Sequence, residues 1–228
     1  MGITGMIYMV TMVFSLIVLI LSSPTVGYDY FQFTQQYQPA VCHFNPTPCK
    51  DPPDKLFTVH GLWPSNSTGN DPIYCKNTTM NSTKIANLTA RLEIIWPNVL
   101  DRTDHITFWN KQWNKHGSCG HPAIQNDMHY LQTVIKMYIT QRQNVSEILS
   151  RAKIEPVGKF RTQKEIEKAI RKGTNNKEPK LKCQNNTQRT ELVEVTICSD
   201  RNLKQFIDCP RPILNGSRYY CPTNNILY

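Results

Sequence analysis

The eight cysteines are the feature of this 228-residue sequence that most restricts its fold. All of them follow residue 27: Cys42, Cys49, Cys75, Cys119, Cys183, Cys198, Cys209 and Cys221. An even number of cysteines in a chain that enters an oxidising compartment predicts a disulfide framework, here of four bridges. Spacing alone leaves about 105 ways to pair them. No Cys-x-x-Cys pair indicates a zinc site, and we expect no metal.

The N-terminal segment indicates that the chain enters such a compartment. Residues 1–27 contain no Asp, Glu, Lys or Arg, and residues 7–21 are nearly all apolar. About fifteen apolar residues are few for a membrane span but suit the core of a signal peptide. We therefore predict a signal peptide over residues 1–27 and a secreted, extracellular domain over residues 28–228, without stable membrane association after cleavage. The segment lacks the usual basic residue, which leaves an uncleaved anchor as the alternative.

The mature chain is basic and rich in glycosylation signals. Because the leader carries no charge, the net charge of +9 belongs to residues 28–228. A basic surface attracts polyanions such as RNA, although many secreted proteins are basic for solubility. The Asn-x-Ser/Thr signals, which mark candidate glycosylation sites on the surface, are Asn66, Asn77, Asn81, Asn87, Asn144, Asn185 and Asn215.

Periodicity predicts an α+β domain. We expect a strand over residues 28–37, a Pro-rich loop over 42–54, a helix over 83–95 and strands from residue 181 onward. A buried helix face is predicted by the apolar residues Met128, Leu131, Val134, Ile135, Tyr138 and Ile139. Apparent capping boxes at 144–147 and 162–165 predict two more helix starts. These elements suit helices packed against a mostly antiparallel sheet in one domain.

Residues 108–119, FWNKQWNKHGSC, combine an apolar side with a chemically rich one. At about 100° per residue, one sector of the helix collects Phe108, Lys111, Gln112, Lys115 and His116. The tryptophans of the stretch gather on the other side. A histidine held at a helix end can act as an acid or base near neutral pH. The alternative is an amphipathic helix with an incidental histidine.

A second stretch, residues 57–64 (FTVHGLWP), places His60 at the end of a short apolar run, just before Gly61. Two histidines on separate rigid elements suit a reaction in which one proton is removed and another is supplied. Cleavage of an RNA phosphodiester through its 2′-hydroxyl is such a reaction. A cation and amide donors would stabilise the charge that builds on the phosphoryl oxygens.

Together the two stretches resemble the active-site segments of the T2 family of secreted ribonucleases. The likeness extends over residues 28–228. It implies a single T2-type domain and a metal-independent, cofactor-free endoribonuclease that acts as a monomer on single-stranded RNA. It also implies the disulfide pairs Cys42–Cys49, Cys75–Cys119, Cys183–Cys221 and Cys198–Cys209.

The resemblance implies two sets of site residues. The catalytic set is His60, Gln112, Lys115 and His116. The substrate-binding set is Gln36, Asn98, Val99, Leu100, Phe108 and Lys111. In this interpretation His116 is the base on the 2′-hydroxyl and His60 the acid on the 5′-oxygen, yielding a 2′,3′-cyclic phosphate. The bystander histidines are His43, His105, His121 and His129.

Two positions depart from the family pattern, which often has His at Lys111 and Glu at Gln112. An amide can still donate to a phosphoryl oxygen, but it cannot raise a neighbouring imidazole pKa as a carboxylate would. We therefore expect reduced or pH-shifted activity rather than its loss.

Within the family the sequence most resembles the style ribonucleases of gametophytic self-incompatibility in the rose family, apple and pear especially. That likeness implies a stylar location, a cytotoxic role and a pollen-side recognition partner, for which residues 65–91 are the candidate surface. The alternatives are a stress, phosphate-scavenging or defence ribonuclease, and a binding glycoprotein with a weakened site.

Overall fold

Strand β5 (Thr190–Asp200) organises the sheet of the computed structural model, which describes residues 27–140, 143–210 and 221–228. The strand order is β2-β1-β5-β7-β3, and β4 and β6 also pair with β5. Every pairing in the described residues is antiparallel except that of β5 with β7. The predicted α+β domain with a mostly antiparallel sheet is confirmed.

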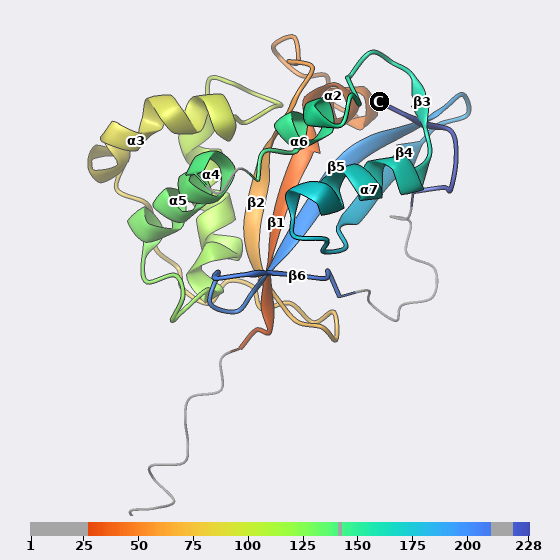
Figure 1. The fold of residues 1–228 in the computed structure, drawn as a ribbon. Helices are drawn as coiled ribbons and strands as arrows, with labels where there is room; N and C mark the ends of the chain where they lie inside the picture. The colour runs from red at the N-terminus through yellow and green to blue at the C-terminus, as the bar shows by residue number, and fades with distance from the viewer. Residues whose placement is uncertain (1–26, 141–142, 211–220) are drawn as a thin grey trace, which may run out of the picture.

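The other elements follow the chain order shown in Figure 1. The remaining strands are β1 (Tyr30–Tyr37), β2 (Phe57–Ser65), β3 (Phe160–Arg161), β4 (Lys180–Asn185), β6 (Phe206–Ile207) and β7 (Ile226–Leu227). The α-helices are α2 (Gln38–Phe44), α3 (Ser82–Ile95), α4 (His105–Lys115), α5 (Asp127–Ile135), α6 (Val145–Arg151) and α7 (Gln163–Gly173). Two further turns are the 3-10 helix η1 (Gly117–Cys119) and the π-helix η2 (Lys136–Thr140).

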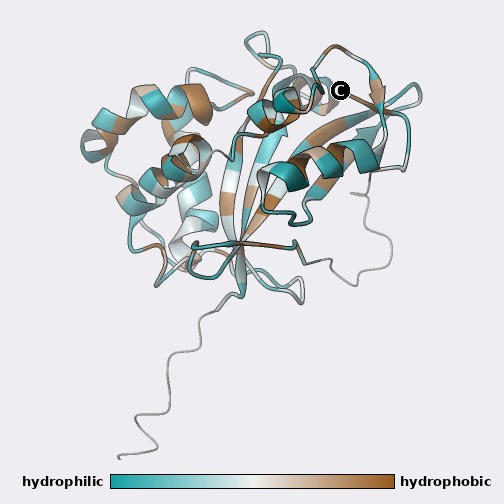
Figure 2. Ribbon diagram, in the orientation of Figure 1, coloured by the Kyte–Doolittle hydropathy of each residue, from teal (hydrophilic) through white to brown (hydrophobic). Residues whose placement is uncertain are grey.

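The helices form two groups around the sheet. Figure 1 shows α3, α4 and α5 gathered beside β2, whereas α7 lies over β5 and β4, and α6 packs against α7. Each group covers its own cluster of buried apolar side chains. Helix α7 shows the expected amphipathic banding in Figure 2, with hydrophilic and hydrophobic residues alternating along it.

Most helices begin at a side chain that accepts a hydrogen bond from the first turn. These N-cap residues are Asn81, Asp104, Asn126, Asn144 and Thr162. Such caps satisfy backbone N–H groups that have no partner within the helix. The box predicted at 162–165 is complete, whereas at 144–147 the Glu147 carboxylate accepts from the Asn144 side chain instead.

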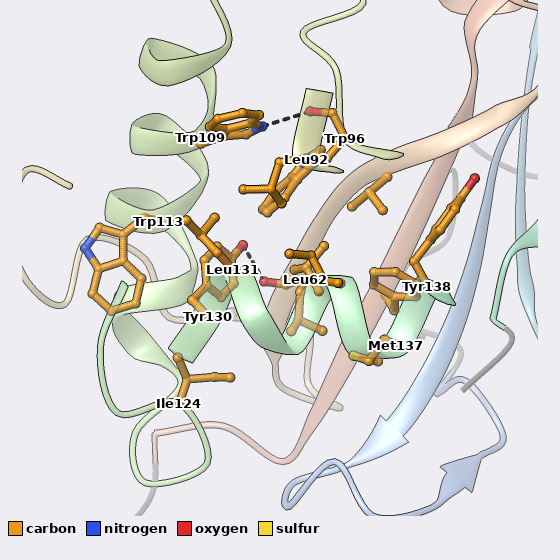
Figure 3. Close-up of a cluster of buried hydrophobic side chains, with 14 of the residues drawn as sticks. Leu62, Leu92, Trp96, Trp109, Trp113, Ile124, Tyr130, Leu131, Met137 and Tyr138 are labelled. Carbon is orange, nitrogen blue, oxygen red and sulfur yellow. Dashed lines mark hydrogen bonds between the residues drawn. The ribbon is translucent and has the colours of Figure 1, made fainter. Parts of the chain in front are cut away.

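Buried aromatic residues tie the first helix group to β2 (Figure 3). The indole N–H of Trp109 donates to the Trp96 carbonyl at 2.8 Å, and the Tyr130 hydroxyl donates to the Leu62 carbonyl at 3.0 Å. The Trp96 indole in turn donates to the backbone carbonyl of His60 at 3.0 Å. Since buried polar groups need such partners, these bonds fix α4 relative to the strand that carries His60.

Two local predictions were wrong. The first residues of the predicted loop over 42–54 belong to α2. Pro39 does not prevent this helix, because it occupies the first turn, where proline is well tolerated. The predicted apolar stripe ends early, because the π-turn η2 shifts the helical register after Ile135. That shift buries Met137 and Tyr138 and leaves Ile139 47% exposed.

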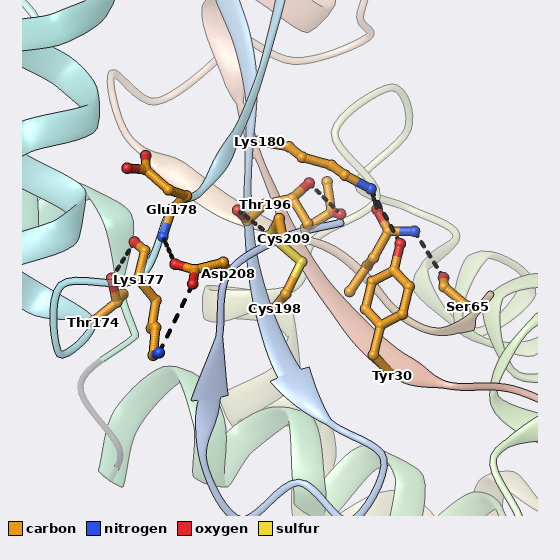
Figure 4. Close-up of a disulfide and its surroundings, with 12 residues drawn as sticks. Tyr30, Ser65, Thr174, Lys177, Glu178, Lys180, Thr196, Cys198, Asp208 and Cys209 are labelled. Atoms are coloured by element: carbon orange, nitrogen blue, oxygen red, sulfur yellow. Dashed lines mark hydrogen bonds and ion pairs between the residues drawn. A yellow bond between two sulfur atoms is a disulfide. The ribbon is translucent and has the colours of Figure 1, made fainter. Parts of the chain in front are cut away.

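The structure forms four disulfides, and their pairing is the one that the family resemblance implies: Cys42–Cys49, Cys75–Cys119, Cys183–Cys221 and Cys198–Cys209. Figure 4 shows how Cys198–Cys209 joins β5 to the segment after β6. The Cys209 N–H donates to the Glu178 carbonyl at 2.9 Å, which links the same segment to the residues before β4.

Nearly all of the predicted signal peptide, and the glycosylation signal at Asn215, lie outside the described residues. Within the described part of the chain, no helix combines the length and the apolar character needed to cross a membrane.

Candidate active site

His60 occupies a β-bulge. The register of β1 and β2 pairs Thr34 with Gly61 and Gln35 with Val59, so His60 is the extra residue of β2. A bulge bends the strand and turns one side chain away from the regular alternation, which is why bulges are frequent beside active sites. Here the His60 side chain is 30% exposed within a strand whose neighbouring residues are buried.

Glu194 of β5 lies against His60. The Glu194 carboxylate is 2.9 Å from Nδ1 of His60 and 3.2 Å from Nζ of Lys182 on β4. Burial would raise the pKa of this carboxyl, but hydrogen bonds and charge interactions with His60 and Lys182 outweigh burial and lower the pKa. The carboxylate therefore holds the ring by Nδ1 and leaves Nε2 for a ligand.

A second bulge brings these β5 residues to the site. The β4–β5 register pairs Lys182 with Glu194 and Cys183 with Leu192, so Val193 is the extra residue. Val193 and Glu194 both line the pocket beside His60. Two bulges on different strands thus converge on one place.

His116 stands at the C-terminal end of α4 in a different environment. Burial lowers the pKa of His116 to about 4, with smaller contributions from the charges of Lys115 and His60. Its Nδ1 atom is buried and has no hydrogen-bond partner among the described residues. The ring is therefore neutral at ordinary pH and has a free lone pair.

Trp63 lies between the two histidines. Its ring centroid is 5.1 Å from that of His60 and 5.2 Å from that of His116. Its indole N–H donates to Oε1 of Gln112 at 3.0 Å, which leaves the Gln112 NH₂ group available as a donor. A Cβ on Gly61 would collide with Trp63 and Gln112, so this close packing requires the glycine.

A pocket of about 300 Å³ opens beside His60 and brings together five of the predicted substrate-binding residues: Gln36, Asn98, Val99, Leu100 and Phe108. Asn98 is held firmly, since its side chain donates to the Asp104 carbonyl and its backbone N–H donates to Nδ1 of His105, each at 3.0 Å. His105, which was predicted to be a bystander, therefore supports the pocket wall.

The remaining predicted residue lies elsewhere. Lys111 lines a separate groove on the outer flank of α4, together with Lys115. Lys115 borders both the groove and, as the neighbour of His116, the two-histidine site.

Sequence reasoning missed Glu194, Lys182 and Phe44, which also contribute to the site or its pocket. Glu194 did carry a signal, because a carboxylate inside an apolar strand is rarely buried without a partner. No group of three or more His, Cys, Asp or Glu side chains in the described residues could hold a metal ion.

Comparison with known proteins identifies the family. The profile of the Ribonuclease T2 family matches residues 28–209. "Ribonuclease S-6" of Pyrus pyrifolia is 76% identical, with 100% of each chain covered. "Ribonuclease S-1" of the same species is 70% identical over 98% of this chain and 99% of its own. The crystal structure of Japanese pear S3-RNase superposes with a TM-score of 0.82 at 62% identity, covering 88% of this chain and 100% of that one. The chain therefore belongs to the Ribonuclease T2 family and is an endoribonuclease of that type.

Proposed function

We propose that His116 and His60 cleave single-stranded RNA by transphosphorylation. His116 takes the proton of the 2′-hydroxyl, whose oxygen attacks the adjacent phosphorus. The bond from phosphorus to the 5′-oxygen breaks as His60 donates a proton to that oxygen. The products are a 2′,3′-cyclic phosphate and a free 5′-hydroxyl, so protons and bonds balance.

The observation that carries this assignment is the contrast between the two rings around Trp63. Burial lowers the pKa of His116 to about 4, so its ring is uncharged and able to accept a proton. His60 has a carboxylate 2.9 Å from Nδ1, which offsets the positive charge that an acid carries before it donates. Pairs of titratable groups in opposed environments divide acid and base roles in this way.

Charge on the phosphoryl oxygens is stabilised by Gln112 and Lys115. The Trp63 indole holds the Gln112 oxygen, so the amide presents N–H donors. Lys115 adds a positive charge that acts on the neighbouring His116. Such fixed donors stabilise the transition state more than the ground state.

The nucleotide after the scissile bond fits the pocket beside His60. Phe108 and Leu100 offer apolar surface to a base, and Gln36 and Asn98 offer polar groups at its edge. Because Asn98 is already fixed by two hydrogen bonds, it loses little side-chain freedom on binding.

The biological role that we propose is the style-side cytotoxic determinant of self-incompatibility. The high identity to pear proteins named as S ribonucleases supports it. In this role residues 1–27 are a signal peptide, and residues 28–228 are secreted into the stylar matrix. There the protein is a monomer that meets a pollen-side protein. The proposed recognition surface is residues 65–91, which contain most of the glycosylation signals. Style-restricted expression would distinguish this role from stress or phosphate scavenging.

The first test of the chemistry is cleavage of a dinucleotide by the purified mature protein in EDTA. We expect metal-independent cleavage with a 2′,3′-cyclic phosphate as the first product. Because His116 must be neutral to act as base, kcat/KM should fall about tenfold per pH unit below pH 4. Absence of cleavage between pH 4 and 8 would refute the enzymatic assignment of the site and favour a binding glycoprotein.

The role of residues 65–91 has a separate test. Exchange of this segment between two alleles should change which pollen is rejected, while cleavage of a dinucleotide stays the same. An exchange that leaves the rejected pollen unchanged would contradict the recognition role.

A further inference from the structure

The segment from Tyr74 to Met80 is fastened along the outer flank of α4. Its backbone N–H groups donate at alternate positions to side chains one helical turn apart: Lys76 to Ser118 at 3.2 Å, Thr78 to Asn114 at 3.1 Å and Met80 to Asn110 at 2.7 Å. The Cys75–Cys119 disulfide and a bond of 3.0 Å from the Tyr74 N–H to the Lys115 carbonyl close the same end. The segment is therefore a fixed wall.

A groove of about 700 Å³ lies between this wall and α4. Its charged lining residues are Lys76, Lys111 and Lys115, and no carboxylate lines it. No ion pair within the described residues includes any of these lysines. Lys111 and Lys115 are also four residues apart on one helix, where like charges repel. An anion in the groove would relieve this repulsion.

Tyr74 adds an aromatic surface to the groove. The residue is 64% exposed, although large aromatic residues usually bury most of their area. Its backbone φ is 55°, in the left-handed region that residues other than glycine rarely adopt. Such conformations persist where the surrounding structure holds them, often at ligand sites. The disulfide at Cys75 and the bond to Lys115 hold this one.

We infer that the groove binds the sugar-phosphate backbone of single-stranded RNA beyond the dinucleotide that is cleaved, with Tyr74 as a platform for one base. Lysines that follow the phosphates and an aromatic ring that stacks a base are the two elements of sequence-tolerant single-strand binding. The inference rests on the proposed function, since Lys115 joins the groove to the two-histidine site. The groove is distinct from the base pocket beside His60 and shares no lining residue with it.

The test measures binding of a 12-nucleotide 2′-O-methyl RNA, which lacks the attacking hydroxyl, to mature protein produced without glycans. Lys76→Ala should weaken binding about three- to tenfold and make the plot of log K against log salt shallower by about 0.7, the value of one single-strand phosphate contact. The matched control is Lys168→Ala, an exposed lysine of α7, which lies away from α4 (Figure 1) and should change neither quantity. Equal effects of the two variants would overturn the inference.

Tyr74 provides an independent arm of the same experiment. Tyr74→Ala should weaken binding about fivefold or more, whereas Tyr74→Phe, which keeps the ring, should bind like the parent protein. A loss in both variants would mean that the backbone conformation, and not stacking, was disturbed, and would overturn the platform. Cleavage of a dinucleotide by the parent protein tests the proposed function separately, because oligonucleotide binding does not require catalysis.

Discussion

Strand β5 holds two carboxylates that make nearly the same contact. Glu194 lies 2.9 Å from Nδ1 of His60, and Glu191 lies 2.7 Å from Nδ1 of His43. Both carboxylates are buried, and the two imidazoles are 30% and 36% exposed. By distance and burial alone the two pairs could not be told apart.

Their surroundings differ in what lies beyond the histidine. The aromatic neighbour of His60 is Trp63, whose ring also lies against His116 and whose indole N–H donates to Gln112. The aromatic neighbour of His43 is Phe44, whose ring carries no hydrogen-bond donor and so links His43 to no further polar group. Each carboxylate also has a second cationic partner, which is Arg189, just before β5, for Glu191 and Lys182 of β4 for Glu194. A histidine–carboxylate pair therefore marks an active site only where a second proton-transfer group lies within reach of the same substrate.

The largest effect should come from removing the histidines themselves. His116→Ala and His60→Ala should each lower kcat/KM for a dinucleotide by about 10³-fold or more, since each removes one general acid–base group. His43→Ala should stay within about twofold of the parent, although it breaks a pair of the same geometry. Near-normal cleavage by His116→Ala would show that the base is another residue.

Breaking the connection through Trp63 should have the next largest effect. Gln112→Ala removes the amide donor and should lower kcat/KM about 10- to 100-fold, with little change in KM. Trp63→Phe frees the Gln112 amide to rotate. The fold-loss of kcat/KM in the variant that carries both changes should therefore be smaller than the product of the two single fold-losses. Gln132→Ala, an exposed amide on α5, is the control. Independent effects of Gln112→Ala and Trp63→Phe would mean that the indole does not position the amide.

The two carboxylates give the most direct comparison. Glu194→Gln keeps an oxygen that can accept from Nδ1 of His60 but removes the negative charge, and should lower kcat/KM about tenfold, or roughly 1.4 kcal/mol. Glu191→Gln should change cleavage less than twofold. Equal losses would indicate that both carboxylates act through the stability of β5.

Much of the site could be predicted because it is local in sequence. His60 with Gly61, and Gln112 with His116, each lie within one short stretch, and the spacing of the second stretch indicates a helix face. The strand end expected at His60 was wrong, because β2 continues through a bulge to Ser65. The helix over 83–95 and the strand at 28–37 were likewise placed within two residues of α3 and β1. Local periodicity is enough to predict a structure when a single helix or strand supplies all the residues of the pattern.

The rest depended on contacts between distant residues. Glu194 lies 134 positions from His60, and no local pattern reports a bulge that brings them together. Residues 191–199 of β5 are all buried, because the polar face of the strand also meets partners from distant parts of the chain, namely histidines, Lys182 and Thr34. Helix α2 and the π-turn after Ile135 were missed for a similar reason, since packing overrides weak propensity in short elements.

The smallest predicted effect concerns the contribution of the buried His116 ring to stability. The unfolded chain protonates this histidine near pH 6.5, whereas the folded chain does so only at about pH 4. Between these values the unfolded state binds more protons, so the free energy of unfolding must fall as the pH falls. In His116→Gln this contribution is absent. Thermal melts should therefore show the parent losing roughly 3–6 °C more than the variant between pH 6.5 and 4, with parallel curves above that range. Parallel curves throughout would mean that His116 is as accessible to protons in the folded chain as in the unfolded one, and the contrast between the two catalytic rings would disappear.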